Sequence, residues 1–274
     1  MSTFKDLGIP SSQSTVIVKA IDVGVPSTRL PAAYFIEPVF PGYETFSGPI
    51  YAFIIEHALT GKRLMFDLGS TELVIGPGMD TRTFPSTPDS PLLESDFVNG
   101  IKPQLFRDYH RGLRGHGLLS DGSLYILNSP GHQKGHITAL ARVTPTSFVL
   151  LGGDSCHHPG QLRPTVNHHK HFACPGHILE SLRDLSISSR TAPLLSVPPG
   201  RSAYADQETS LATISKLSRL DANPDVLVLI AHDSTAPGVI DEFPKSLNDW
   251  KAKGWKDKLM WAFLEKNSPA FRFG

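Results

Sequence analysis

The stretch LNSPGHQKGHITAL, residues 127–140, places two histidines four residues apart directly after a Pro-Gly turn. Apolar residues flank the turn: Leu124–Leu127 leads into it, and Ile137–Val143 follows it. Short apolar, β-branched runs bounded by Pro and Gly are typical of strands. The sequence therefore predicts a strand–turn–strand unit with His132 and His136 at its tip.

Other segments extend this pattern into one domain, residues 15–274, preceded by a flexible lead-in at 1–14. Helical spacing of apolar residues predicts helices at 178–185, 206–220 and within 247–264, and the segment 80–117 is expected to be mostly irregular. Val226–Ile230 is continuously apolar, as expected for a strand buried on both faces. Further strands are predicted at 15–20, 33–37, 51–56, 63–67, 71–75 and 147–151.

Composition excludes several classes of protein. The 274 residues carry 26 basic and 26 acidic side chains, which gives no reason to expect nucleic acid or an anionic membrane as a partner. Cys156 and Cys174 form no disulfide framework, which suits a reducing compartment. No apolar leader opens the sequence, and no apolar run approaches the roughly 20 residues of a membrane span. These features predict a cytoplasmic protein.

Three motifs follow predicted strands: Ser129-Pro-Gly-His132, Leu151-Gly-Gly-Asp154 and Ile230-Ala-His232-Asp233. Loops at one rim of a sheet converge in space, and two imidazoles with one carboxylate are suitable ligands for zinc. Each motif also has a simpler interpretation. His132 can be a turn residue, Asp154 a helix cap, and His232 a hydrogen-bonded core residue.

Taken together, the motifs resemble those of the metallo-β-lactamase superfamily of hydrolases. The resemblance rests on the strand end Phe66-Asp67-Leu68-Gly69, on SPGHQKGH, on LLGGD and on the distant IAHD. The segments FIIEHALTGKRLMFDLG, STELVIGPG and DSCHHPGQLRP are most similar to lactonase-like members found in fungi. The resemblance implies an α+β fold, a four-layer αββα sandwich with the metal site at one edge of its two sheets.

The resemblance also implies roles for the three residues. His132 would be the third histidine of a first zinc site, His232 the last histidine of a second, and Asp154 the catalytic carboxylate that bridges both ions. The family reaction would open a small cyclic ester or amide by metal-bound hydroxide. A lactone or lactam that serves as a defence compound or xenobiotic is the small-molecule substrate that this implies, and detoxification is the role.

One part of the family pattern is absent. Members carry a His-x-His-x-Asp-His signature after the Asp-x-Gly strand end, whereas here Gly69 is followed directly by Ser70 and the segment 71–78. No histidine occurs between His57 and His110, so four of the seven expected ligands are missing. We therefore expect a truncated N-terminal half, possible association into a homodimer, and one weak zinc site or none.

Replacements for the missing ligands exist in principle. The histidines near Asp154 can be such replacements, or simply a polar loop over the rim of the site: His157, His158, His168, His169 and His171. Cys156 lacks an activating partner, and Tyr204 can face substrate or pack internally. No Gly-x-Ser-x-Gly elbow supports a serine hydrolase. The alternative to an enzyme is a degenerate, non-catalytic member that binds a ligand or is inactive.

Overall fold

Two β-sheets face each other in the computed structural model, which describes residues 7–24, 30–67, 121–178, 190–265 and 268–270, with short pieces between 74 and 119. The first sheet has the order β1 (Val16–Asp22), β4 (Tyr51–His57), β5 (Arg63–Phe66). The second has the order β10 (His116–Gly117), β11 (Leu124–Asn128), β12 (Ile137–Thr144), β13 (Ser147–Leu151), β14 (Val226–Leu229). All neighbouring strands in these sheets are antiparallel except β13 and β14, which run parallel.

The remaining elements are short apart from one helix. Paired two-residue strands are β2 (Leu30–Pro31) with β3 (Thr45–Phe46), β6 (Val74–Ile75) with β9 (Gln104–Leu105), and β7 (Thr83–Phe84) with β8 (Leu92–Leu93). The α-helices are α1 (Val166–His171), α3 (Gln207–Asp221) and α4 (Trp255–Met260). Short 3₁₀ turns occur at Ala32–Tyr34, Gly153–Ser155, Pro159–Gln161 and Ala262–Leu264. No helix in the described ranges has the length and apolar character that crossing a bilayer requires.

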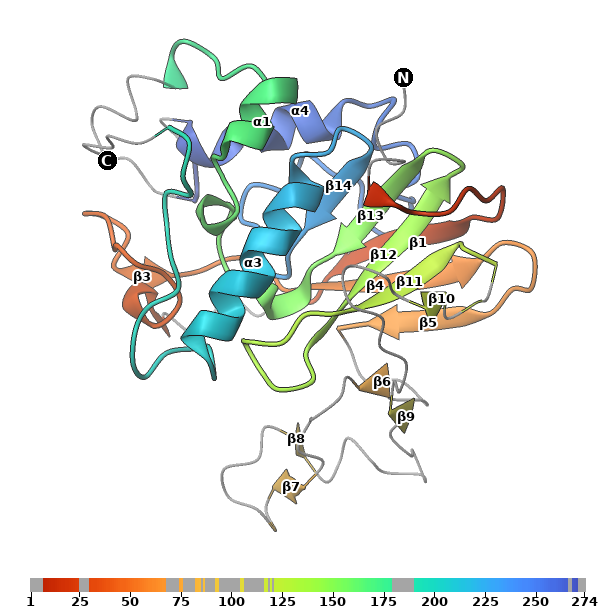
Figure 1. Ribbon diagram of the computed structural model, residues 1–274, viewed down its shortest axis with the longest axis horizontal. Coiled ribbons are helices and arrows are strands. Elements are labelled where there is room, and N and C mark those ends of the chain that lie inside the picture. The colour runs from red at the N-terminus through yellow and green to blue at the C-terminus, as the bar shows by residue number, and fades with distance from the viewer. Residues whose placement is uncertain are drawn as a thin grey trace.

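The main core lies between the two sheets. Alternate residues of β1 (Val16, Val18 and Ala20) are fully buried there, and inward residues of β4 and of the larger sheet complete the cluster. Helix α3 crosses the opposite face of the larger sheet (Figure 1) and buries Ile214 and Leu217 against it. All four residues of β14 are therefore buried, which explains its unbroken apolar sequence.

The outer face of the first sheet is less covered. Ile17, Ile21 and Ile54 point away from the main core, are half-buried and belong to none of the apolar clusters of the described residues. No described helix packs on them. The described residues therefore supply the two sheets and one outer helical layer, α3.

The strand predicted at 33–37 is wrong. The chain instead forms the 3₁₀ turn at Ala32–Tyr34, where the Phe35 N–H donates to the Ala32 carbonyl at 2.9 Å. Phe35 and Ile36 are both buried in a second apolar cluster, so the side chains do not alternate between two faces as they do in a strand.

The other predicted strands outside 71–75 are present within one or two residues. The His-rich segment 156–177, predicted as a loop, contains the helix α1. The helix predicted at 178–185, beyond Ile178, lies outside the described residues, and so do most of the segment 80–117 and the junction of Gly69 and Ser70.

Candidate metal centre

Asp154 lies just beyond the end of β13, at the rim of the larger sheet. Two backbone hydrogen bonds to the neighbouring strand end, Gly152 N to Leu229 O at 2.7 Å and Ala231 N to Gly153 O at 3.1 Å, fix the turn that carries it. Gly153 has φ of 50°, and a Cβ there would lie 3.2 Å from Asp67 Oδ2. Only glycine therefore allows the turn to approach that carboxylate.

His132 reaches Asp154 from the Pro-Gly turn between β11 and β12. Its Nε2 lies 3.6 Å from Asp154 Oδ2. Ala205 N–H donates to the His132 carbonyl at 2.9 Å and Asp206 N–H donates to the Gly131 carbonyl at 3.0 Å, so the segment that begins α3 clamps this turn.

His232 comes from the segment after β14. Its Nε2 lies 3.0 Å from Asp154 Oδ1, and its Nδ1 lies 3.0 Å from the Pro49 carbonyl oxygen. A carbonyl oxygen can only accept, so Nδ1 carries a proton. In neutral His232 the Nε2 lone pair therefore faces Asp154, as in a metal-ligating histidine.

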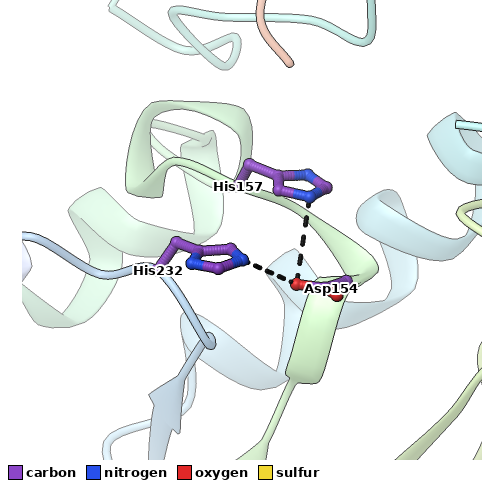
Figure 2. Close-up of side chains that lie close together, drawn as sticks. All are labelled: Asp154, His157 and His232. Atoms are coloured by element: carbon purple, nitrogen blue, oxygen red, sulfur yellow. Dashed lines mark ion pairs between the residues drawn. The ribbon is translucent and has the colours of Figure 1, made fainter. Parts of the chain in front are cut away.

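His157 joins the group from the loop that follows Asp154. Its Nε2 lies 3.8 Å from Asp154 Oδ1, and its side chain is 2% exposed. Figure 2 shows His157 and His232 reaching toward the same carboxylate; their rings are parallel within 10° at a centroid distance of 5.5 Å. One ligand atom each from Asp154, His157 and His232 lie within 4.8 Å of one another.

The charges of the group are strongly coupled. Burial alone would raise the pKa of Asp154, but contact with His232, aided by His157 and His132, holds that pKa well below its usual range. The pKa of His232 is raised, because its contact with Asp154 outweighs burial. Burial lowers the pKa of His157 to about 3, so this imidazole is neutral at physiological pH.

Two further side chains support the centre. His136 accepts the Asp154 N–H on Nε2 at 3.2 Å and contacts Ser129 Oγ through Nδ1 at 2.9 Å. Burial lowers its pKa to about 4. Burial of the Asp67 carboxyl and the nearby charge of Asp154 raise the pKa of Asp67 to about 7.

The donor set fits a divalent ion such as zinc. Asp154 Oδ1 and His132 Nδ1 are buried and make no hydrogen bond within the described structure. A buried carboxylate oxygen without a donor is costly, and an ion between it and the imidazole nitrogens would satisfy it. Imidazole and carboxylate ligands suit zinc.

An aromatic wall lies beside the centre. The Phe35 ring is 4.8 Å from the His157 ring, the Phe46 ring is 5.6 Å from the His232 ring, and the two phenyl rings stack at 4.4 Å. Both phenylalanines come from the N-terminal segment around β2 and β3, so that segment shields two of the imidazoles from water.

The three sequence-predicted ligands, His132, Asp154 and His232, are thus brought together. The sequence left His157 open as a replacement ligand or as part of a polar rim, and the structure places it beside the same carboxylate. Its position three residues after Asp154 was the available signal. Other histidines have structural contacts instead: His158 bonds Gly160 N and Ala270 O, and His168 bonds Asp221. Cys156 is buried, and burial raises the pKa of its thiol above the range of a reactive cysteine.

Comparison with known proteins finds several relatives of the chain. No family model matches the chain. A cytochrome P450 monooxygenase of Penicillium roqueforti is 32% identical over 94% of the chain, but the chain spans only 38% of that protein. A γ-lactamase of Fusarium pseudograminearum is 28% identical over 95% of the chain and 84% of its own length. A metallo-hydrolase of Annulohypoxylon moriforme is 29% identical over 96% of the chain and 90% of its own length.

Solved structures identify the fold. A quorum-quenching N-acyl homoserine lactone lactonase covers 86% of the chain with a TM-score of 0.52 at 12% identity. A second such hydrolase gives a TM-score of 0.50 over the same share. The chain therefore has the metallo-β-lactamase fold of these enzymes. Its relatives include a γ-lactamase and a metallo-hydrolase.

The alignments also bear on the missing signature. They extend over 339 to 356 residues, although the chain has 274. Each of these relatives therefore has at least 65 positions (339 less 274) inside the matched span without a counterpart here. The chain is thus shorter than the matched part of these relatives, and a missing segment between Gly69 and Ser70 stays a prediction.

Proposed function

We propose that the chain is a metal-dependent hydrolase that opens a small cyclic ester or amide, with His132, Asp154 and His232 holding the ion and Asp154 as the catalytic carboxylate. The observation that carries the proposal is the buried, unsatisfied Asp154 Oδ1 with His157 and His232 nitrogens facing it. The names of the relatives, a γ-lactamase and a metallo-hydrolase, support the substrate class.

Zinc is the ion we propose. When bound, it would polarise a carbonyl and lower the pKa of water. The chain's own residues orient and shield the site: Pro49 and Asp154 fix His232, His136 holds the Asp154 backbone, and the aromatic pair Phe35 and Phe46 excludes water from one side. Apolar walls with a few fixed polar groups are typical of sites for small organic molecules.

The cytoplasm is the compartment we propose. Cys156 and Cys174 are both free, which suits a reducing environment.

Turnover of a panel of five-membered lactones and lactams tests the function. Purified protein supplied with zinc should release the ring-opened carboxylic acid, detected by mass spectrometry, and Asp154→Asn should reduce the rate by at least about 100-fold. The matched control is Asp257→Asn, which changes an exposed carboxylate on α4. If the lactones or lactams bind to zinc-loaded protein but are not opened, the proposal is contradicted. That result would favour a non-catalytic binding protein.

A further inference from the structure

Gln161 has a fixed orientation in the loop that follows Asp154. Its Nε2 donates to the carbonyl oxygens of Phe35 and Ser196, each at 3.1 Å. Its Oε1 accepts the backbone N–H groups of His157 at 2.8 Å and His158 at 3.2 Å. The residue is 1% exposed, and this pattern leaves its Oε1 as an acceptor only.

Tyr204 relays this orientation to His157. Its hydroxyl lies 3.1 Å from Gln161 Oε1 and 2.9 Å from His157 Nδ1. The hydroxyl has one hydrogen, which it must donate to the amide oxygen because that oxygen cannot donate. The Tyr204 oxygen therefore accepts from His157, and Nδ1 of His157 carries a proton.

This chain of hydrogen bonds determines what His157 presents to Asp154. With Nδ1–H engaged, the neutral imidazole has its lone pair on Nε2, which faces Asp154 Oδ1 at 3.8 Å. That separation is too long for a hydrogen bond, and both atoms are acceptors. In the neutral form of His232, which Pro49 holds in the same tautomer, three electron pairs converge on one point.

We propose that His157 is a third imidazole ligand, beside His132 and His232, of a single metal ion on Asp154, and that Tyr204 and Gln161 are positioning residues that hold it in the ligating tautomer. Three imidazoles are a ligand set that catalytic zinc uses, with a further position left for another group. His157 thereby supplies an imidazole in a chain that lacks the His-x-His-x-Asp-His signature. The inference rests on the metal site of the proposed function, and it assigns to His157 a role that the sequence motifs do not.

Metal binding to the metal-free protein tests the role of His157 without any measurement of turnover. Titration with Co²⁺, followed by calorimetry and by the visible absorption of the bound ion, should show a loss of affinity of at least about 100-fold in His157→Ala. Tyr204→Phe should weaken binding by about 10- to 100-fold, as loss of a partner behind a ligating histidine does. The control His171→Ala removes an exposed histidine at the end of α1, and this variant should bind like the unmodified protein.

The tautomer provides the second readout. Long-range ¹H–¹⁵N spectra of metal-free protein should show Nδ1–H on His157 and His232, and Tyr204→Phe should abolish this preference in His157 only. Adding Zn²⁺ should shift the Nε2 resonance of His157. An Nε2–H tautomer for His157, or unchanged Co²⁺ affinity in a folded His157→Ala or His157→Gln, would overturn the inference. If His157 is needed for tight metal binding but no lactone or lactam is turned over, the ligand role of His157 holds and only the proposed hydrolysis is contradicted.

Discussion

The Asp154 side chain is partly exposed, but its Oδ1 is buried, and three imidazoles face the carboxylate. Asp154 can share a metal ion only with imidazoles that turn a nitrogen lone pair, and not an N–H, toward it. For His232 the Pro49 carbonyl favours this, because it holds the proton on Nδ1. The arrangement is therefore decided by groups behind the histidines as much as by the histidines themselves.

Metal affinity should follow this division. We expect His132→Ala, Asp154→Ala and His232→Ala each to lower zinc affinity by about 10- to 100-fold or more, because each removes a candidate ligand atom. His136→Ala should cost less, since His136 reaches Asp154 through the backbone N–H and not through the carboxylate. Isothermal titration of metal-free variants with zinc measures this order. Equal losses at all four positions would mean that His136, and not only His132, faces the ion.

Part of this cluster of side chains could be predicted from the sequence. His132, Asp154 and His232 follow strands, and strand ends at one rim converge, so their proximity was predictable. His157 lies in an irregular loop, where no periodicity indicates which way a side chain points. Its orientation is set by Tyr204, 47 residues away, and by Gln161. That pairing arises only from the tertiary fold.

At the scale of elements, the Pro-Gly turn and α3 form one unit. Gly131 has φ of 135°, and a Cβ there would lie 2.5 Å from backbone atoms of Ser210. Thr213 Oγ1 additionally donates to the Pro130 carbonyl at 2.6 Å. The missing side chain of Gly131 therefore lets the helix approach the turn that carries His132.

Gly131→Ala should separate these two elements. We expect a loss of at least about 2 kcal/mol in the free energy of unfolding, since the new methyl group clashes with backbone and the conformation is strained. Gly176→Ala is the matched control, because a Cβ there meets nothing within 4 Å. Urea denaturation of both variants measures the difference. A Gly131→Ala protein as stable as the control would show that α3 can shift without cost.

Elements were predictable where a local pattern and burial agree. The inward alternation of β1 and the continuous apolar run of β14 each follow from the faces that they bury. The segment 33–37 is as apolar as a strand, but Phe35 and Ile36 fill a cluster with Phe46 from β3, which no local rule indicates. The packing of this segment beside His157 was likewise not readable from sequence.

For the whole molecule, a buried ionic cluster joins three parts of the chain. Asp221 at the end of α3 is fully buried and receives two hydrogen bonds from Arg163, at 2.5 and 2.9 Å, and one contact from His168 at 3.0 Å. Lys256 of α4 bonds the Asp221 carbonyl at 2.6 Å. Although burial opposes ionisation, Arg163 and Lys256 hold the pKa of Asp221 well below its usual range.

Asp221→Asn should cost about 3–5 kcal/mol at pH 7, because it leaves the buried Arg163 charge without its partner. The folded pKa of Asp221 is depressed, so the unfolded chain binds the proton first and acid favours unfolding. The stabilisation is thus complete above about pH 4 and declines as the pH falls toward the folded pKa. Denaturation at pH 7 and pH 3.5 should show the gap between the two proteins narrowing in acid, whereas Asp257→Asn should stay within about 0.5 kcal/mol throughout. A gap independent of pH would contradict the assignment.

On the outer face of the first sheet, Ile17, Ile21 and Ile54 are half-buried and no described helix packs on them. We expect the segment predicted to be missing between Gly69 and Ser70 to cover this face in the relatives. If about 400 Å² of apolar surface lost its cover, roughly 10 kcal/mol of burial would be forfeited at about 25 cal/mol per Å², which matches the net stability of a typical domain. We therefore expect the isolated chain to dimerise through this face or to aggregate.

Inserting the corresponding segment of the Fusarium γ-lactamase between Gly69 and Ser70 tests this expectation. The insertion should raise the melting temperature and yield a monomer in sedimentation, because it would add an outer layer. It should also increase bound zinc from at most one equivalent to two, because it would add new ligands. A monomeric, cooperative melt of the unmodified chain above about 55 °C would instead show that this face needs no further cover.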